Sequence, residues 1–196
     1  MSYAGIILTF VFVNNFVLTR FLGLCPVISN SDRLDHALGL GAAVTFIMSL
    51  ASLGSWLLFH IVLQPLGIEF LQTVTFVLIS AGLVQLTSHL VSRFVPVLER
   101  FVGSYFSLIT TNCAVLGITL IAVRSDYNAG ESLVAGISAG AGFVLALLLV
   151  STLREKLDHE WVPEPFRGTP IAFISMGLMA MAFMAFDRAL LVNLVG

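Results

Sequence analysis

The sequence predicts an all-α integral membrane protein, and two observations carry that prediction. Of the 196 residues, 58% are hydrophobic and only 10% are charged, whereas soluble domains are about 25% charged. A water-soluble fold of this length has too much surface for so few charged side chains to cover. In addition, six apolar stretches are each long enough to cross a bilayer, which takes roughly 20 residues.

The six predicted spans cover residues 4–24, 36–60, 70–91, 101–123, 131–153 and 170–192. Proline, glycine and charged residues mark the breaks between them, as in Gln64-Pro65-Leu66-Gly67 and Arg124-Ser125-Asp126. The first span has neither the basic start nor the small-x-small cleavage site of a signal peptide, so we expect it to cross the membrane. The spans leave no room for a soluble domain, and we expect one membrane domain over residues 1–196.

The basic residues predict how the spans are oriented, because cytoplasmic connections are enriched in Lys and Arg. The odd-numbered connections contain six of these residues: Arg33, Arg93, Arg100, Arg154, Lys156 and Arg167. The opposite side has only Arg124 and Arg188. Both termini are therefore predicted to face the periplasm. Arg20 lies inside the first span, and we expect it to reach the cytoplasmic edge.

The two halves of the chain resemble each other, which predicts an inverted repeat. A shift of 97 positions aligns six identical pairs: Asn15 with Asn112, Gly39 with Gly136, Ala42 with Ala139, Phe46 with Phe143, Leu50 with Leu147 and Phe76 with Phe173. A unit of three spans must insert upside down when it is repeated. The sequence therefore predicts a 3+3 inverted repeat with halves of about residues 1–98 and 99–196, an architecture whose sites lie on broken helices near the midplane.

Polar residues occur at matching places in spans one and four, as Asn14-Asn15 and as Thr110-Thr111-Asn112-Cys113. An unpaired amide in hydrocarbon costs several kcal/mol, so these side chains must face protein, water or a cofactor. One interpretation is hydrogen bonding between helices, which is common in membrane bundles. The other is that the matching clusters form a functional site.

The two cysteines, Cys25 and Cys113, also allow two interpretations. A lone membrane cysteine is usually an inert small apolar residue. Alternatively, both thiolates bind a soft metal such as iron. Two thiolates are half of the four ligands of a [2Fe–2S] cluster, so another chain would have to complete it.

A shared centre would require a broken helix, because straight helices place the two cysteines at different depths. Counted from residue 4, Cys25 would lie about 31 Å into the membrane at the cytoplasmic edge. Counted from residue 101, Cys113 would lie roughly 18 Å in, near the midplane. We therefore predict that spans one and four are broken, at Asn14-Asn15 with Gly23 and Pro26, and at Thr110-Thr111-Asn112.

Several longer motifs resemble a known family. Val13-Asn14-Asn15-Phe16-Val17-Leu18 and Phe21-Leu22-Gly23-Leu24-Cys25-Pro26 resemble the opening of the A subunits of Rnf electron-transport complexes. Residues 108–117 (Leu-Ile-Thr-Thr-Asn-Cys-Ala-Val-Leu-Gly) and 162–168 (Val-Pro-Glu-Pro-Phe-Arg-Gly) are similar to later signatures of the same family. The E subunit of the sodium-pumping NADH:quinone reductase is a close relative of that family.

The resemblance implies a translocase subunit of the bacterial inner membrane, in a complex that couples electron transfer between ferredoxin and NAD to movement of Na⁺ or H⁺. It implies that the homologous Rnf E subunit, with opposite topology, is the partner, together with the other Rnf subunits. Two cysteines from each chain would hold one intramembrane [2Fe–2S] cluster, with Cys25 and Cys113 at the ligand positions. No complete active site, and no catalytic residue, is expected in this chain.

Two competing functions do not need iron. A secondary transporter of the inverted-repeat type would use Asn15 and Asn112 in a solute pocket, and a structural subunit would use neither. Nucleic-acid binding is excluded by composition, because nine Lys and Arg against eleven Asp and Glu leave no basic surface.

Overall fold

The computed structural model describes residues 3–30, 34–64, 72–94, 112–125, 127–159, 163 and 166–195. Within these ranges all regular structure is helical and no strand occurs. The elements in chain order are α1 (Tyr3–Leu8), the π-helix η1 (Thr9–Val13), α2 (Leu24–Asn30), α3 (Leu34–Leu58), the π-helix η2 (Phe59–Leu63), α5 (Gln72–Phe94), α7 (Cys113–Arg124), α8 (Ala129–His159) and α9 (Thr169–Val195). The predicted all-α class is confirmed.

Each of the six predicted spans contains helix where the chain is described, but the first span is interrupted and α2 extends beyond its predicted end. Two of them, over Ala37–Ile61 and Ala129–Leu157, are long and apolar enough to cross a membrane by length and composition. Four shorter apolar helices cover Tyr3–Val13, Thr73–Leu86, Cys113–Arg124 and Thr169–Met184. Residues 101–111 of the fourth predicted span lie outside the described residues. The count of six crossings and the inverted repeat stay predictions.

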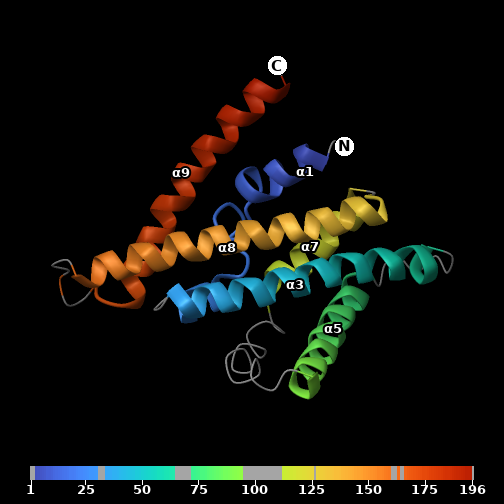
Figure 1. Cartoon of the computed structure of the whole chain (residues 1–196). Helices are drawn as coiled ribbons and strands as arrows, with labels where there is room; N and C mark the ends of the chain where they lie inside the picture. Colours follow the sequence, from blue (N-terminus) through green and yellow to red (C-terminus); the bar gives the residue numbers. More distant parts are fainter. Residues whose placement is uncertain are drawn as a thin grey trace.

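Helices α3 and α8 form the centre of the fold, side by side and antiparallel (Figure 1). Their backbones touch where α8 has glycine. A Cβ on Gly140 would lie 2.6 Å from the Thr45 Cα, and a Cβ on Gly136 would lie 2.8 Å from the Ser49 Cα. No larger residue fits at that spacing, and small residues four positions apart are the usual means by which membrane helices approach closely. The small-x-x-x-small pattern in the sequence of α8 already signals this contact.

The remaining helices cover the two sides of this central pair. Helices α1 and α9 lie on the side of α8, and α5 lies on the side of α3 (Figure 1). The Tyr3 hydroxyl lies 3.6 Å from the Cβ position of Gly130, which places the start of α1 beside the start of α8. At the other end, Arg154 Nη1 donates a hydrogen bond of 2.9 Å to the carbonyl of Ile28. The first segment therefore runs parallel to α8 from one end of the molecule to the other.

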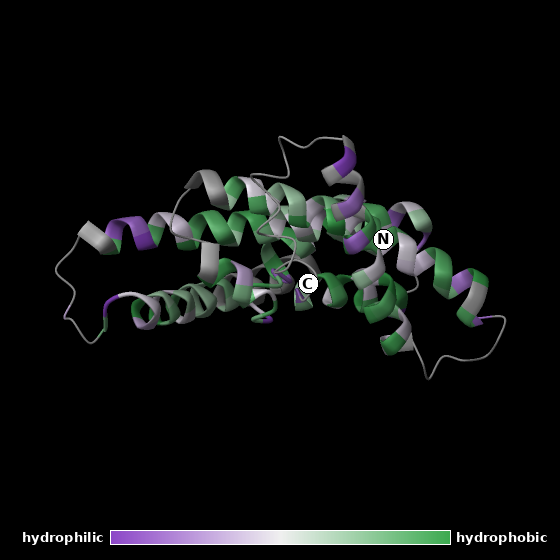
Figure 2. Cartoon of the chain, turned by 90° about the horizontal axis from the view of Figure 1, so that it is seen from below, coloured by the Kyte–Doolittle hydropathy of each residue, from purple (hydrophilic) through white to green (hydrophobic). Residues whose placement is uncertain are grey.

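Apolar side chains form the outer surface as well as the core. The core is filled by residues such as Phe10, Phe76 and Phe143, whereas Leu78 on α5 and Met181 on α9 are 69% and 61% exposed. Figure 2 shows hydrophobic residues along most of each helix, with hydrophilic ones gathered toward the helix ends. A surface of this kind is stable only against lipid or other protein.

Candidate functional site

The first predicted span is interrupted between η1, which ends at Val13, and α2, which begins at Leu24. We call residues 14–23 the first break. Asn15 lies near the start of the first break and is fully buried. The Asn15 Oδ1 accepts hydrogen bonds from the N–H groups of Val17 (3.1 Å) and Leu18 (3.3 Å). The break predicted at Asn14-Asn15 is thus observed, and the side chain supplies the bonds that the helix no longer makes.

The Asn15 amide also ties the first break to α8. Its Nδ2 donates to the carbonyl of Gly142 at 2.8 Å and to that of Val11 at 3.2 Å. Both polar atoms of this buried side chain are therefore satisfied within the chain, as buried amides require. This contact confirms the interpretation that Asn15 bonds between helical segments.

Apolar packing holds the middle of the first break in place. Phe16, Val17 and Leu18 are all buried. The Phe16 ring stacks on Phe10 with centroids 5.9 Å apart, and a Cβ on Gly117 of α7 would lie 3.1 Å from the Phe16 ring. At residues 16–18 the irregular backbone is thus enclosed by protein, which is the condition under which it survives at membrane depth.

The first break ends at Gly23, whose backbone N–H donates a hydrogen bond of 3.0 Å to the Cys113 Sγ. Gly23 has φ = +81°, a conformation that glycine adopts at little cost. A Cβ on Gly23 would also lie 3.0 Å from the Asn112 Oδ1 and 3.1 Å from the Phe143 ring. Glycine is therefore required here for two reasons, and it brings the exit of the first break against the start of α7.

Cys113 is the first residue of α7 and is exposed. Asn112 caps this helix in an extended conformation (φ −74°, ψ 110°), with its Oδ1 accepting from the N–H of Ala114 at 3.0 Å. Helix α7 thus begins in the middle of the fourth predicted span, at the polar cluster where a break was predicted. Thr110 and Thr111 of that cluster lie outside the described residues.

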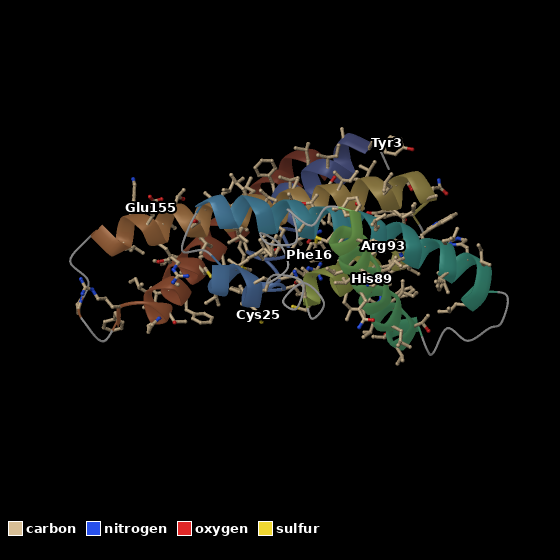
Figure 3. The ribbon with its side chains drawn as sticks, turned by 60° about the horizontal axis from the view of Figure 1, so that its bottom comes forward. Tyr3, Phe16, Cys25, His89, Arg93 and Glu155 are labelled. Atoms are coloured by element: carbon tan, nitrogen blue, oxygen red, sulfur yellow. The ribbon has the colours of Figure 1, made fainter. Side chains whose placement is uncertain are left out.

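Cys25 is the second residue of α2 and is also exposed. In Figure 3 it lies at the lower edge of the molecule, with Phe16 further inside. Two residues of chain reach at most about 7 Å, so the Cα of Cys25 lies near Gly23 and the sulfur of Cys113. Both thiols are free. The structure therefore brings the two predicted site residues to one region of the surface.

Contacts with α8 give the depth of this region. Asn15 bonds to Gly142, and Gly23 packs against Phe143. These α8 residues lie about 20 Å from its start at Ala129 and about 25 Å from its end at His159. The first break therefore makes almost no progress along α8. Its residues bring Cys25 back to the depth of Cys113, whereas a straight helix would have carried it to the membrane edge.

Arg20 does not lie where the sequence predicted. Its Nη2 donates to the Oδ1 of Asn14 at 3.4 Å, and Asn14 precedes the residue bonded to Gly142. The guanidinium is therefore at the level of the middle of α8 and not near the cytoplasmic edge. Counting 1.5 Å per residue places Arg20 too far along the first span, because the chain does not advance along α8 within the first break.

The described residues contain no group of three or more His, Cys, Asp and Glu side chains that could hold a metal ion. Cys25 and Cys113 therefore have no third ligand of these types beside them in this part of the chain. Two contacts were not predicted from the sequence. One is the packing of the Phe16 ring against Gly117, and the other is the hydrogen bond from Arg154 to the Ile28 carbonyl of α2. A glycine on the helix after the second polar cluster was the only available signal for the first contact.

These features define a class: a helical membrane protein in which an irregular mid-depth segment lies between helices that carry two surface cysteines. Residues 3–190 match the family model described as "Rnf-Nqr subunit, membrane protein". The chain belongs to this Rnf-Nqr family, as its motifs suggested.

Curated relatives cover almost the whole chain. It is 45% identical over 187 residues to the A subunit of the "Na(+)-translocating ferredoxin:NAD(+) oxidoreductase complex" of Acetobacterium woodii, covering 95% of this chain and 97% of the relative. It is 48% identical over 176 residues to the A subunit of the "Ion-translocating oxidoreductase complex" of Pseudoalteromonas atlantica, covering 90% and 91%. The protein of the same name from Aliivibrio fischeri is 47% identical over 185 residues, covering 94% and 96%.

Proposed function

We propose that this chain is a membrane subunit of an ion-translocating oxidoreductase complex, and that Cys25 and Cys113 supply half of the ligands of a [2Fe–2S] cluster shared with a homologous subunit. The hydrogen bond from the Gly23 N–H to the Cys113 Sγ carries the proposal, because it fixes the chain two residues before Cys25 against the sulfur of Cys113. The relatives' names, as subunits of such complexes, support the same function.

The donor set fits an iron–sulfur cluster. Both side chains are free, exposed thiols, and thiolates are the ligands that hold such clusters. Each cysteine lies in the first turn of a helix, where the backbone dipoles favour negative charge. When bound, the cluster would supply one-electron transfer through the membrane.

The chain's own residues would orient the thiolates and exclude water. Gly23 donates its N–H to the Cys113 sulfur at 3.0 Å, and hydrogen bonds to the sulfurs are among the features that set a cluster's potential. Inside the first break the side chains of Phe16, Val17 and Leu18 are buried, and Phe16 lies against Gly117 of α7, which would keep water from the inner side of the site. The exposed side is left for the second subunit.

The inverted repeat, and with it a six-span topology, is part of the proposal. Asn15 and Asn112, aligned by the shift of 97 positions, each accept a hydrogen bond at Oδ1 from the N–H two residues later, at 3.1 Å and 3.0 Å. Helices α3 and α8, which the shift places at equivalent positions, pack antiparallel with Thr45 against Gly140, as a two-fold relation between the halves requires. Local geometry and helix packing thus both support two halves related by a two-fold axis.

We infer that both termini face the periplasm of the bacterial inner membrane, because the odd-numbered connections contain six of the eight Lys and Arg residues outside the first span, and two of these six lie at the end of α8 far from the N-terminus. Arg154 lies there beside Ile28, and Lys156 follows on the same helix. A reporter that works only outside the cytoplasm, fused after residue 196, should be active. Activity of a cytoplasmic reporter at that point would reverse the orientation.

The test is the spectrum of the assembled complex. Cys25→Ser or Cys113→Ser should each remove one [2Fe–2S] signal from the electron paramagnetic resonance (EPR) spectrum and block electron transfer. Thr119→Ser, a matched small change inside α7, should leave the signal intact. The chain purified alone should bind little iron, and a full cluster on the isolated chain would contradict a shared site.

The transporter alternative is weakened by the bonds of Asn15. A solute pocket needs polar groups free to bind the solute, but both polar atoms of Asn15 bond within the chain. Iron content of the purified complex distinguishes the two functions, since a transporter needs none.

A further inference from the structure

Arg20 is a charged residue at mid-depth on the outer surface of this chain. Its side chain is exposed, and its guanidinium is held at the level of Asn14, next to the bond between Asn15 and Gly142. From there the nearest edge of the hydrocarbon is about 15 Å away, half the thickness of the bilayer core. That distance is too great for one arginine side chain to reach the headgroups.

The bonds that Arg20 makes within the chain do not neutralise it. Its one hydrogen bond within the described part of the chain, to the neutral amide of Asn14, is long at 3.4 Å. Among the described residues no carboxylate pairs with it. An arginine at this depth faces an anion or water and not lipid, because hydrocarbon strongly disfavours its charge. The surface around Arg20 must therefore meet an anion or water and not lipid.

The same segment leads directly to the cysteines. Arg20 lies three residues before Gly23, which bonds to the Cys113 sulfur, and five residues before Cys25. Between them, Phe21 is 50% exposed and has φ = +55°, an uncommon conformation for a residue with a side chain. The first break thus presents its positive charge on the surface that leads to both thiols.

We propose that Arg20 is the counter-charge of the cluster and raises its reduction potential; this rests on the proposed function. Four thiolates and two sulfides outweigh the charge of two ferric ions, so a [2Fe–2S] cluster is an anion, and reduction adds a further negative charge. A nearby cation stabilises the reduced form more than the oxidised form. Arg20 is a positioning and electrostatic residue, and it does not itself bind iron.

The experiment is an EPR-monitored redox titration of the purified complex. Arg20→Met should keep the cluster and lower its potential, because the reduced form loses its counter-charge. A unit charge about 10 Å from a redox centre, at an effective dielectric of about 20, changes a one-electron equilibrium roughly tenfold. That change corresponds to about 59 mV. Arg20→Lys should stay within about threefold of the wild type.

Arg124→Met is the matched control, since Arg124 is exposed at the far end of α7, about 17 Å from Cys113. Its charge lies further from the cluster, and salt screens an exposed charge at a helix end, so Arg124→Met should change the potential by much less than Arg20→Met does. An unchanged potential in Arg20→Met would overturn the proposal. So would loss of the partner subunit from Arg20→Met while Arg20→Gln assembles with a normal potential, because Arg20 would then pair with the partner and not with the cluster. A wild-type complex without any [2Fe–2S] signal would instead refute the proposed function itself.

Discussion

Asn15 and Asn112 occupy equivalent places in the two halves of the chain, but their amides differ. Each Oδ1 accepts from the N–H two residues later. The Asn15 Nδ2 donates to Val11 and Gly142, whereas the Asn112 Nδ2 is buried and has no hydrogen-bond partner among the described residues. After Asn15 the backbone stays irregular to Gly23, but after Asn112 a helix begins at once with Cys113.

The same asparagine hydrogen bond therefore has different structural consequences in the two halves. In the first half, the asparagine fixes a long irregular segment against α8, and that segment moves Cys25 to mid-depth. In the second half, the asparagine only starts a helix, with the cysteine at its first position. The position of Cys25 therefore depends on tertiary contacts, whereas the position of Cys113 depends on the Asn112 cap.

The largest expected effect comes from the matched pair Asn15→Ser and Asn112→Ser. Serine keeps an acceptor but has no amide donor. Asn15→Ser forfeits the bond to Gly142 and leaves space in the core, so we expect a loss of about 3 kcal/mol of stability. Asn112→Ser retains a good helix cap and should cost less than about 1 kcal/mol. Thermal unfolding of the purified complex measures both, and equal losses would remove the distinction.

Gly23→Ala tests the junction of the two regions. Alanine is strained at φ = +81° and would crowd the Asn112 Oδ1, so we expect a cost of about 1–2 kcal/mol and an altered EPR line shape. Gly177→Ala on α9 is the control, because no atom lies within 4 Å of its Cβ position. A Gly23→Ala complex with an unchanged spectrum and stability would show that the two regions are not joined as described.

Arg154→Met should have a small effect that is confined to α2. It removes the hydrogen bond to the Ile28 carbonyl near the end of α2, which we expect to be worth about 1 kcal/mol. Amide hydrogen exchange in residues 24–30 should accelerate severalfold, while α7 stays as protected as in the wild type. Uniform acceleration over both helices would mean that Arg154 supports the whole fold.

Periodicity and residue type predicted the helices and the polar clusters, but contacts distant in sequence determine the site. The first break was predictable because Asn14-Asn15 and Gly23 interrupt an apolar run. The break predicted at Pro26 is wrong, since Pro26 lies in the first turn of α2, where a helix tolerates proline. The depth of Arg20 was not predictable, since counting 1.5 Å per residue assumes a chain that keeps advancing. Likewise, no local pattern indicates that the Gly23 N–H meets the sulfur of Cys113, because that contact depends on how α7 packs against the first break.

The central claim is that the first break brings Cys25 to the depth of Cys113. The chain has two cysteines, so nitroxide labels can be attached to both thiols in membranes that contain this chain without its partners. Singly labelled Cys25→Ser and Cys113→Ser chains provide the reference. We predict strong dipolar broadening of the doubly labelled EPR spectrum relative to the sum of the two single spectra. A doubly labelled spectrum equal to that sum would contradict the account.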